Sequence, residues 1–461
     1  MLHTDTVGHV LLNGHVSESF PIMRGVRQGC PLSAIFYALY IEPFGFMLEH
    51  EPRLVPLNFP GRVAPKTLQY ADDITFLLSE KSSLTKLFQL CSKFQAATGS
   101  TINADKTQGL ALGNPVALDP YFTTIEWRNE DGIDILGISF LTDYYYTRTL
   151  NWRGLLKSIK NTLHKMASRT LSLKGKVLVL NSNVLSKIWY TASILPIPAA
   201  EFQALERYMF DFLWSGKTSP LQRRTVYLPK DQGGLGLLHP LYQQKSLQLK
   251  LLYGVVDAGE KHYATQLPRY WFGRRLGVLR PEWHFLTSNH LPHFVGHHFP
   301  PYYKDLLETF LTMDMSKLPK GPVPWTTKLF YLQFMHEHKH EPRAFQDFWS
   351  AHRVDCSTMW KHVFSTYAIG KHQCVHYRFL HRVLPTQGFM RQRFRGKGFA
   401  NLSPKCLACP NAVETNEHLF FRCVAATLLL TYIYPSIQVL LENKPFKLFK
   451  LALNIFLPKF L

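Results

Sequence analysis

The chain has 461 residues, of which 46% are apolar and 14% aromatic. This composition excludes general disorder, and the length allows roughly two to four domains, each with its own core. The net charge of +20 is unevenly placed: residues 1–144 hold 10 Lys and Arg against 15 Asp and Glu, and residues 145–461 hold 42 against 17. Because clustered cations displace the counterions of a polyanion, the second part predicts salt-dependent binding of nucleic acid.

Cysteine usage and hydropathy indicate a reducing compartment and no membrane anchor. The seven cysteines form no disulfide framework, and the N-terminus lacks the basic and apolar segments of a signal peptide. Residues 424–441 are uncharged and long enough to span a membrane. Their polar residues and Pro435 favour a packed helix-turn-helix instead.

The first predicted elements are a hairpin and a helix. Residues 9–12 and 15–18 flank Asn13-Gly14, the pair that best suits a type I′ turn. The stretch Arg-Gly-Val-Arg-Gln-Gly-Cys-Pro-Leu-Ser at residues 24–33 then runs into an apolar segment. We expect a helix over residues 33–48, with a kink or an end at Pro43.

The next feature is an acidic turn, Tyr70-Ala71-Asp72-Asp73, between two apolar runs that predict a pair of strands. Neighbouring carboxylates repel each other unless a cation lies between them, and hard oxygen ligands suit Mg²⁺. The turn therefore predicts metal-assisted phosphoryl transfer. An ordinary hairpin that uses Asp as a turn former is the alternative.

Several shorter elements follow. Ser82 or Ser83 can cap a helix that ends at Gly99. Residues 152–195 are helical in pattern and basic without a single acid, as helices lying along a duplex require. The Gly-Gly-Leu-Gly run at residues 233–236 lacks the Lys-Ser/Thr ending of a phosphate loop and predicts a turn.

A basic and aromatic stretch covers residues 351–405, with ten Lys and Arg and one acid. Cations that follow a backbone, with rings on which bases stack, suit single-stranded nucleic acid. We expect more than half of the aromatic residues to be core instead. The run Arg391, Arg393, Arg395 and Lys397 is the firmer prediction for nucleic-acid contact.

Four candidate metal ligands come next, in the order Cys406-x2-Cys409-x8-His418-x4-Cys423. Three thiolates and one imidazole can close a tetrahedral site around a structural Zn²⁺, with no open position for catalysis. Metal would then supply much of the folding energy of this small module. The alternative is three buried cysteines and a core histidine.

Two of these motifs resemble one family. The stretch at residues 24–33 followed by Tyr-Ala-Asp-Asp resembles motifs B and C of reverse transcriptases, and Arg-Gln-Gly-Cys-Pro-Leu-Ser at residues 27–33 resembles the LINE-type (non-LTR) retrotransposon enzymes in particular. The Cys/His motif resembles the C-terminal CCHC motif of the same proteins. Residues 102–106 resemble motif D, and residues 134–138 resemble motif E, a short strand that grips the primer end.

The resemblance implies an α+β chain that begins with a partial reverse-transcriptase palm at residues 1–144, carrying motifs B to E. A helical thumb and post-thumb region at 145–252, a linker-like region at 253–345 and a basic aromatic region at 346–405 would follow. The zinc motif at 406–423 and C-terminal helices at 424–461 complete the mostly helical C-terminal part.

The resemblance also implies roles for single residues. Asp72 and Asp73 would bind two Mg²⁺ ions, and Lys106 would serve the leaving pyrophosphate. The nascent base pair and template would lie against four residues: Arg27, Gln28, Gly29 and Tyr70. Lys157 and Lys160 would contact nucleic acid. The partners would be an RNA template and a DNA primer, with no membrane, in the nucleus or cytoplasm.

One departure from the family concerns motif A, whose aspartate lies upstream of the first hairpin. Asp5 is the only nearby candidate, and it stands in no apolar strand. We therefore expect the isolated chain to be nearly inactive as a polymerase while it still binds nucleic acid. One alternative is a repurposed element that acts only as a nucleic-acid-binding protein. Another is an open reading frame that extends upstream of Met1.

Overall fold

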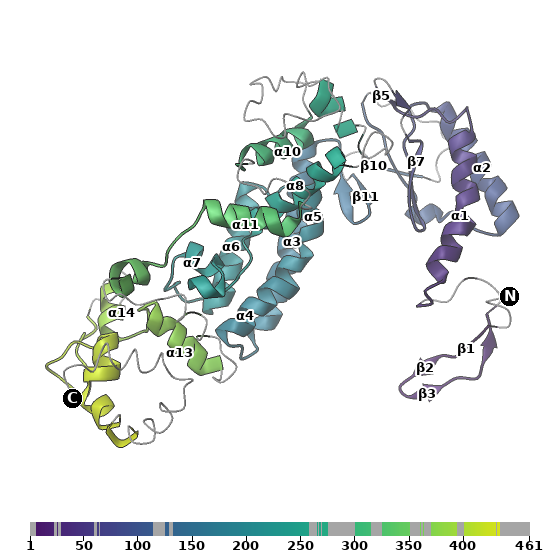
Figure 1. The fold of residues 1–461 in the computed structure, drawn as a ribbon. Helices are drawn as coiled ribbons and strands as arrows, with labels where there is room; N and C mark the ends of the chain where they lie inside the picture. The colour runs from purple at the N-terminus through teal and green to yellow at the C-terminus, as the bar shows by residue number, and fades with distance from the viewer. Residues whose placement is uncertain are drawn as a thin grey trace. The chain divides into compact units, whose positions relative to one another are not determined.

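The computed structural model describes residues 6–22, 25, 29–59, 62–63, 65–113, 125–128, 132–257, 265, 267–268, 270–274, 300–314, 325–350, 360, 363, 370–393, 401–429 and 431–433 (Figure 1). The chain divides into two compact units. Unit 1 comprises residues 1–147, 255–282 and 292–296. Unit 2 comprises residues 148–254, 283–291 and 297–461.

Unit 1 begins with the predicted hairpin, which has an inner and an outer pair of antiparallel strands. Leu12 pairs with His15 across Asn13 and Gly14, whose φ angles of 50° and 87° make the turn that the strands require. An outer pair of strands continues the hairpin. The four strands are β1 (Val7–Gly8), β2 (Leu11–Leu12), β3 (His15–Val16) and β4 (Phe20–Pro21), with β1 antiparallel to β4.

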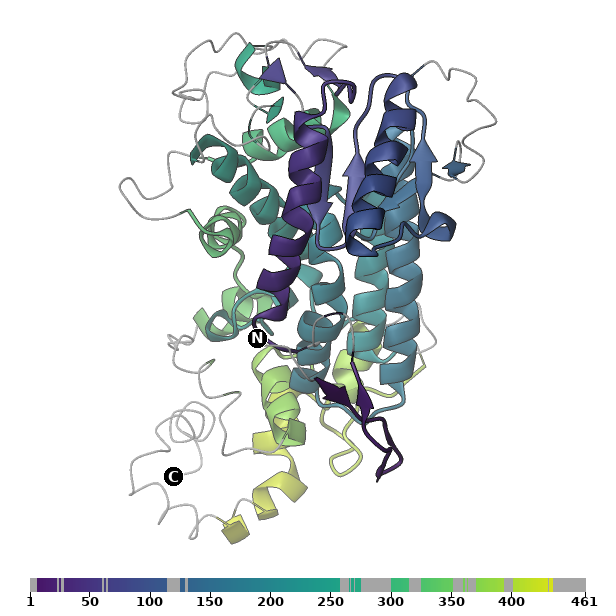
Figure 2. The ribbon, with the colours of Figure 1, turned by 90° about the vertical axis from the view of Figure 1, so that its right-hand side faces the viewer.

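Two helices and a hairpin form the core of unit 1. Helices α1 (Ser33–His50) and α2 (Ser82–Thr98) lie side by side, as Figures 1 and 2 show. Phe44 and Phe94 stack between them with ring centroids 4.7 Å apart. The hairpin consists of β7 (Thr67–Tyr70) and β8 (Asp73–Phe76), and a smaller one of β5 (Asn58–Phe59) and β6 (Arg62–Val63).

The remainder of unit 1 is made of short elements. The described ones are η1 (Ala104–Lys106), β9 (Gln108–Leu110), β10 (Glu126–Arg128), β11 (Ile133–Ile135), β12 (Ile138–Phe140) and η6 (Tyr270–Arg274). β10 is parallel to β9, and β11 is antiparallel to β12. The region resembling motif E is therefore a hairpin around Leu136 and Gly137, both with positive φ, rather than the single short strand that we expected.

Unit 2 is built from helices, and its main core buries Trp152, Leu180, Met209 and Tyr377. Its helices are α3 (Tyr144–Ala167), which begins at the end of unit 1, α4 (Leu173–Val179), α5 (Trp189–Ile194), α6 (Ala199–Trp214), α7 (Arg223–Tyr227), α8 (Pro240–Asp257), α10 (Pro301–Leu311), α11 (Thr327–Glu337), α13 (Gly370–Leu380) and α14 (Gln387–Arg393). Shorter helical turns are η3 (Leu180–Val184), η4 (Leu185–Lys187), η5 (Lys230–Gln232), η9 (Phe345–Trp349) and η12 (His418–Arg422).

The mixture of strands and helices agrees with the predicted α+β class at the coarse level, whereas the palm and thumb assignment stays a prediction. In the described parts of residues 253–345, helices α10 and α11 bury Leu306, Phe310, Phe330 and Phe334. Among the described residues, no helix is both long and apolar enough to cross a membrane. Residues 434–441, the second half of the predicted helix-turn-helix, lie outside the described residues.

The predicted helix over residues 33–48 is confirmed: α1 begins at Ser33 and continues through Pro43 to His50, which excludes an end at the proline. The predicted cap of the next helix was wrong. Neither Ser82 nor Ser83 caps α2, because both lie inside the helix. The buried Ser83 hydroxyl instead donates to the Arg53 carbonyl and accepts from the Val55 N–H, each at 3.0 Å. The serine therefore fixes the preceding loop. Gly99 ends α2 with a φ of 73°, as predicted.

Candidate functional site

Strands β7 and β8 form the acidic hairpin, which presents its two carboxylates at the tip. Tyr70 pairs with Asp73, and only Ala71 and Asp72 lie between them. Ala71 has a φ of 53°, a conformation that tight two-residue turns need. Asp72 and Asp73 are both exposed. The local fold thus brings the predicted pair together where a cation and its waters can reach both side chains.

Side chains on one face of the hairpin pack against the helices and so hold the turn in place. Successive side chains in a strand point to opposite faces. Ile74 and Phe76 consequently pack on the core formed by α1 and α2, while Asp73 points to the other face. On β7, Gln69 lies against Gly45 of α1, where a Cβ would be 3.1 Å from its Nε2 atom. The strands that carry the carboxylates are therefore packed against α1 and α2 on one face.

The charge of Asp72 in the turn also affects the pKa of a tyrosine on helix α1. Burial, and the negative charge of Asp72 after it, raise the pKa of the Tyr37 phenol. The tyrosine is therefore a neutral hydroxyl on the side of α1 nearest the turn. The Tyr37 hydroxyl therefore brings no charge of its own to the turn.

Of the other predicted palm residues, Tyr70 flanks the turn directly, as the partner of Asp73 in the ladder. The Lys106 side chain is exposed at the end of η1, and its backbone N–H donates to the Asn103 Oδ1 atom at 3.2 Å. Within the described part of the chain, no hydrogen bond or ion pair joins Lys106 to either aspartate. Tyr70 is 69% exposed, and Gly29 has a φ of 84°. Arg27 and Gln28 lie outside the described residues.

Helix α3 carries the predicted cations of the basic segment. Its core face is made by Trp152, Leu156, Ile159 and Leu163, at spacings of three and four residues. Lys157 and Lys160 each follow a core residue by one position and are exposed. The amphipathic pattern therefore turns a row of cations to solvent, as predicted.

Lys176, by contrast, is structural. Its ammonium group donates to the carbonyls of Phe212 and Leu213 at 3.0 and 3.4 Å and to the Ser215 hydroxyl at 2.6 Å. These groups lie at the C-terminus of α6, where a cation satisfies unpaired carbonyls. Burial, and Arg378 after it, lower the pKa of Lys176.

In the basic aromatic stretch, the described aromatic residues serve mainly the core. Trp360 and Tyr377 are buried in the core of unit 2, which confirms for them that aromatics of this stretch are packed rather than stacked on bases. Arg391 is half-buried and Arg393 exposed on α14. Arg395 and Lys397 lie outside the described residues.

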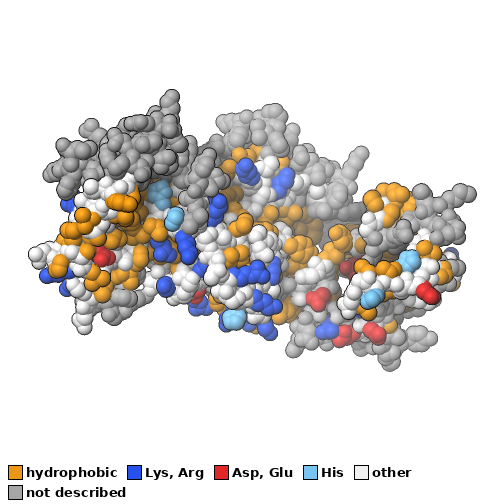
Figure 3. Space-filling model, turned by 90° about the horizontal axis from the view of Figure 1, so that it is seen from below, with side chains coloured by type: hydrophobic (Ala, Val, Ile, Leu, Met, Phe, Trp, Pro, Cys, Tyr) orange, Lys and Arg blue, Asp and Glu red, His pale blue; other side chains and the backbone are white. Residues whose placement is uncertain are grey.

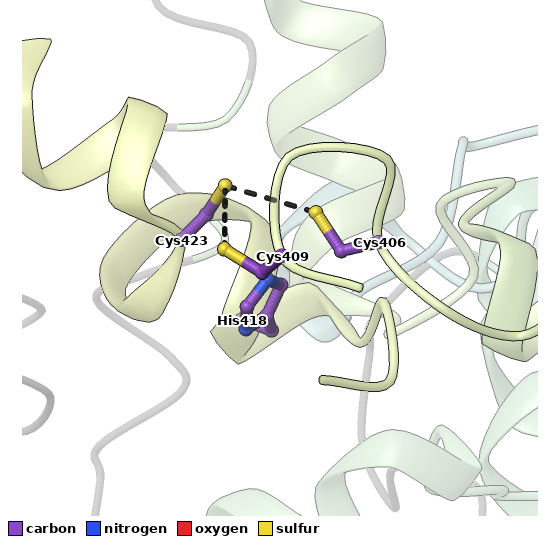
Figure 4. A group of neighbouring side chains, drawn as sticks. All are labelled: Cys406, Cys409, His418 and Cys423. Carbon is purple, nitrogen blue, oxygen red and sulfur yellow. Dashed lines mark hydrogen bonds between the residues drawn. The ribbon is translucent and has the colours of Figure 1, made fainter. Parts of the chain in front are cut away.

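Cys406, Cys409, His418 and Cys423, which we call the Cys/His cluster, come together at one point (Figure 4). One potential ligand atom from each side chain lies within 4.8 Å of all the others. The Cys423 sulfur is 3.8 Å from that of Cys406 and 3.9 Å from that of Cys409. All four side chains are buried or half-buried.

The spacing of the Cys/His cluster fits zinc. With Zn–S bonds near 2.3 Å and tetrahedral angles, two sulfur ligands lie about 3.8 Å apart. The Nε2 atom of His418 is buried, and no described group forms a hydrogen bond with it. A metal would satisfy that nitrogen and relieve the approach of the thiolates. The alternative of unconnected core cysteines does not explain four ligand atoms at a single point.

Local turns position the ligands. The Cys406 N–H donates to the Ala412 carbonyl, and the Ala412 N–H to that of Cys409, each at 2.9 Å, which closes a loop over Cys406 and Cys409. Cys423 precedes the helical residues 424–429. The N–H of Ala426 is the main cause of the lowered pKa of the Cys423 thiol.

Long-range contacts that the sequence did not predict attach the segment carrying the Cys/His cluster to other parts of unit 2. Arg382 donates to Glu417, and its guanidinium lies 3.8 Å above the centre of the Phe348 ring. Phe379 of α13 contacts the rings of Phe420 and Phe421. Arg382 and Glu417 are 35 positions apart, so no local spacing could reveal them.

Two segments of the chain match family models of the same class of enzyme. Residues 2–140 match the family model described as reverse transcriptase (RNA-dependent DNA polymerase). Residues 325–429 match the model described as zinc-binding in reverse transcriptase. The second match includes the Cys/His cluster and begins well upstream of it. The chain therefore carries a reverse transcriptase region followed by the zinc-binding region of that enzyme class.

One relative narrows the class further. The chain is 30% identical over 322 residues to a Transposon TX1 uncharacterized 149 kDa protein of Xenopus laevis. The alignment covers 67% of this chain and 24% of that protein, so the chain spans about a quarter of the relative's length. Together with the two family models, this similarity supports a reverse transcriptase region of a LINE-type, non-LTR retrotransposon with a zinc module toward the C-terminus.

Proposed function

We propose that this chain contributes Asp72 and Asp73 to a site for nucleotidyl transfer onto a DNA primer along an RNA template. The observation that carries the proposal is the acidic hairpin, which holds Asp72 and Asp73 exposed at its tip on a packed base. The proposed ligand of these carboxylates is Mg²⁺, which the family generally uses. Synthesis from a chromosomal end would place the protein in the nucleus.

In this proposal each residue has one task. Asp72 and Asp73 would hold the cations. When bound, the ions would supply activation of the primer hydroxyl and neutralisation of the leaving pyrophosphate. Arg27, Gln28, Gly29 and Tyr70 border the nascent base pair and the template. A positive φ at Gly29 allows close approach of the backbone.

Lys106 and the Cys/His cluster have supporting tasks. The Lys106 ammonium would donate a proton to, or offset the charge of, the leaving pyrophosphate. The Cys/His cluster would hold a structural Zn²⁺ with all four positions occupied by protein. It would thus stabilise the C-terminal region without taking part in the reaction.

The test is template-primed DNA synthesis by the purified polypeptide with Mg²⁺. Asp72→Asn should reduce synthesis by roughly 100-fold or more, because the neutral amide neither attracts nor holds the cations. Glu42→Gln, which removes an exposed acid from α1, is the matched control and should leave the rate unchanged. Where the unmodified chain synthesises DNA, an equal rate for Asp72→Asn would refute this role.

A second candidate function is nucleic-acid binding without synthesis. It is favoured by one observation: among the described residues, the carboxylates at the candidate site come from a single hairpin, whereas two metal ions normally need acids from two strands. Asp5, the candidate from upstream, lies outside the described residues. Binding of an RNA–DNA hybrid with no synthesis, unaffected by Asp72→Asn, would favour this second function.

A further inference from the structure

Two long stretches of the sequence contain no acid at all. Residues 144–200 and residues 356–413 each hold nine Lys and Arg and neither Asp nor Glu. The first stretch lies in the basic segment after the hairpins, and the second in the region that matches the zinc-binding model. Acid-free segments of this length concentrate positive potential wherever they meet.

The structure packs these two stretches against each other. Helix α13 contacts α4, and the Leu173 N–H donates to the Cys374 sulfur at 3.4 Å across 201 positions of sequence. Gly370 lies so close to the turn before α4 that a Cβ would be 2.9 Å from the Ser172 Cβ. The residues that flank this contact in both stretches consequently lie near one another.

The flanking residues are cations turned to solvent. Arg169 and Lys174 stand on either side of Ser172, and Lys371 and His372 follow Gly370; all four are exposed. None of the three Lys and Arg residues forms an ion pair with any described residue. We call these four residues the basic face. Figure 3 shows Lys and Arg side chains gathered over this part of unit 2, where α4 and α13 lie, with few Asp or Glu among them.

The contact itself also holds unneutralised charge. Arg378 of α13 is half-buried, and its Nε atom is buried without a hydrogen-bond partner among the described groups. It lies near Lys176 of α4 and contributes, after burial, to the lowered pKa of that lysine. Two cations held this close favour an anion beside them.

We propose that the basic face is one composite site for the sugar–phosphate backbone of an RNA–DNA duplex, shared between α4 and α13. A duplex is favoured over a single strand because α4 carries no aromatic residue and Tyr377 of α13 is buried in the core. Bases therefore find no stacking platform among them. The inference rests on the proposed function only in taking nucleic acid as the ligand.

The consequence is that the two acid-free stretches bind one duplex together. Because the two helices touch at Ser172 and Gly370, a duplex of about one helical turn is long enough to engage both sides. Two separate sites would instead need two short duplexes or one long one.

The test is titration of the full chain with an RNA–DNA hybrid of about 12 base pairs at several salt concentrations. Lys174→Gln and Lys371→Gln should each weaken binding by roughly three- to tenfold and lower the log–log salt slope by about 0.9. The double variant should lower the slope by about twice as much on the same short hybrid. Lys328→Gln, an exposed lysine of α11, is the matched control and should keep the slope.

The outcomes separate this inference from the proposed function. Unchanged slopes in both variants, with tight binding by the unmodified chain, would overturn the composite site and leave the proposed function intact. An effect of Lys174→Gln alone would also overturn it, as would tighter binding of a single strand of the same length. Absence of any binding would overturn both. Circular dichroism and zinc content should match those of the unmodified chain in every variant.

Discussion

At the scale of single residues, Cys423 is the centre of the Cys/His cluster because its sulfur lies within 4 Å of two other cysteine sulfurs. Cys423→Ser should therefore reduce bound zinc from one equivalent to near none, since a hydroxyl is a poor zinc ligand compared with a thiolate. The variant should also unfold at lower urea concentration, because metal binding contributes folding energy. Metal analysis of the purified protein together with urea unfolding gives both readouts.

Cys374→Ser is the control for that experiment. Cys374 is a half-buried cysteine of the same unit that accepts a backbone hydrogen bond, and serine can accept it too. It should keep its zinc. Full zinc occupancy in Cys423→Ser would show that the four side chains do not act as one site.

The four ligands of the Cys/His cluster were predictable because they fall within eighteen positions, where chain connectivity alone keeps them close. The partners that hold the cluster in place were not. The contact of Arg382 with Glu417 and Phe348 depends on how three separate elements pack, and a charged residue in a sequence does not indicate its distant partner. Likewise, the sequence identified Lys176 as a cation but not as the cap of α6.

At the scale of elements, the turn at Gly233 and Gly234 packs against Leu228 before it and accepts hydrogen bonds from residues of α13 and just after it. The Gly233 carbonyl accepts from the Tyr377 hydroxyl at 3.1 Å and from the His381 Nε2–H at 2.7 Å. A Cβ on Gly234 would lie 1.8 Å from the Leu228 carbonyl oxygen, which is impossible without moving the backbone. The sequence predicted a turn here, but its role as the acceptor for α13 depends on packing over more than 140 positions.

Gly234→Ala should consequently destabilise unit 2 by about 3 kcal/mol, because the backbone must shift and the hydrogen bonds to Gly233 weaken. The free energy of urea unfolding measures the effect. Gly154→Ala on α3 is the matched control, since a Cβ there meets nothing within 4 Å. It should be neutral or stabilising by about 0.5–1 kcal/mol. Equal stabilities for the two variants would contradict the tight turn.

At the scale of the whole molecule, the uneven charge predicted where nucleic acid would bind, but it could not show that two acid-free stretches share one face. Long-range packing also decides how the molecule responds to acid. Burial lowers the pKa of His381 to about 4, and burial with nearby His338 and Lys245 lowers that of His239 to about 4. Both histidines are neutral in the folded protein at pH 7, and the His381 Nε2–H donates to Gly233.

The folded state should therefore lose stability as the pH falls from 6.5 toward 4. In this window the unfolded chain takes up a proton on each histidine, whereas the folded chain does not. The stability that each neutral histidine contributes is fully present above pH 6.5. About 2 kcal/mol of the free energy of unfolding is lost per histidine by pH 5. In His381→Gln, which cannot titrate there, urea unfolding at pH 7.5 and pH 5 should show a pH effect smaller by that amount. His164→Gln, an exposed histidine on α3, should follow the unmodified chain. A parallel decline of His381→Gln and the unmodified chain would mean that carboxylates alone cause the acid sensitivity.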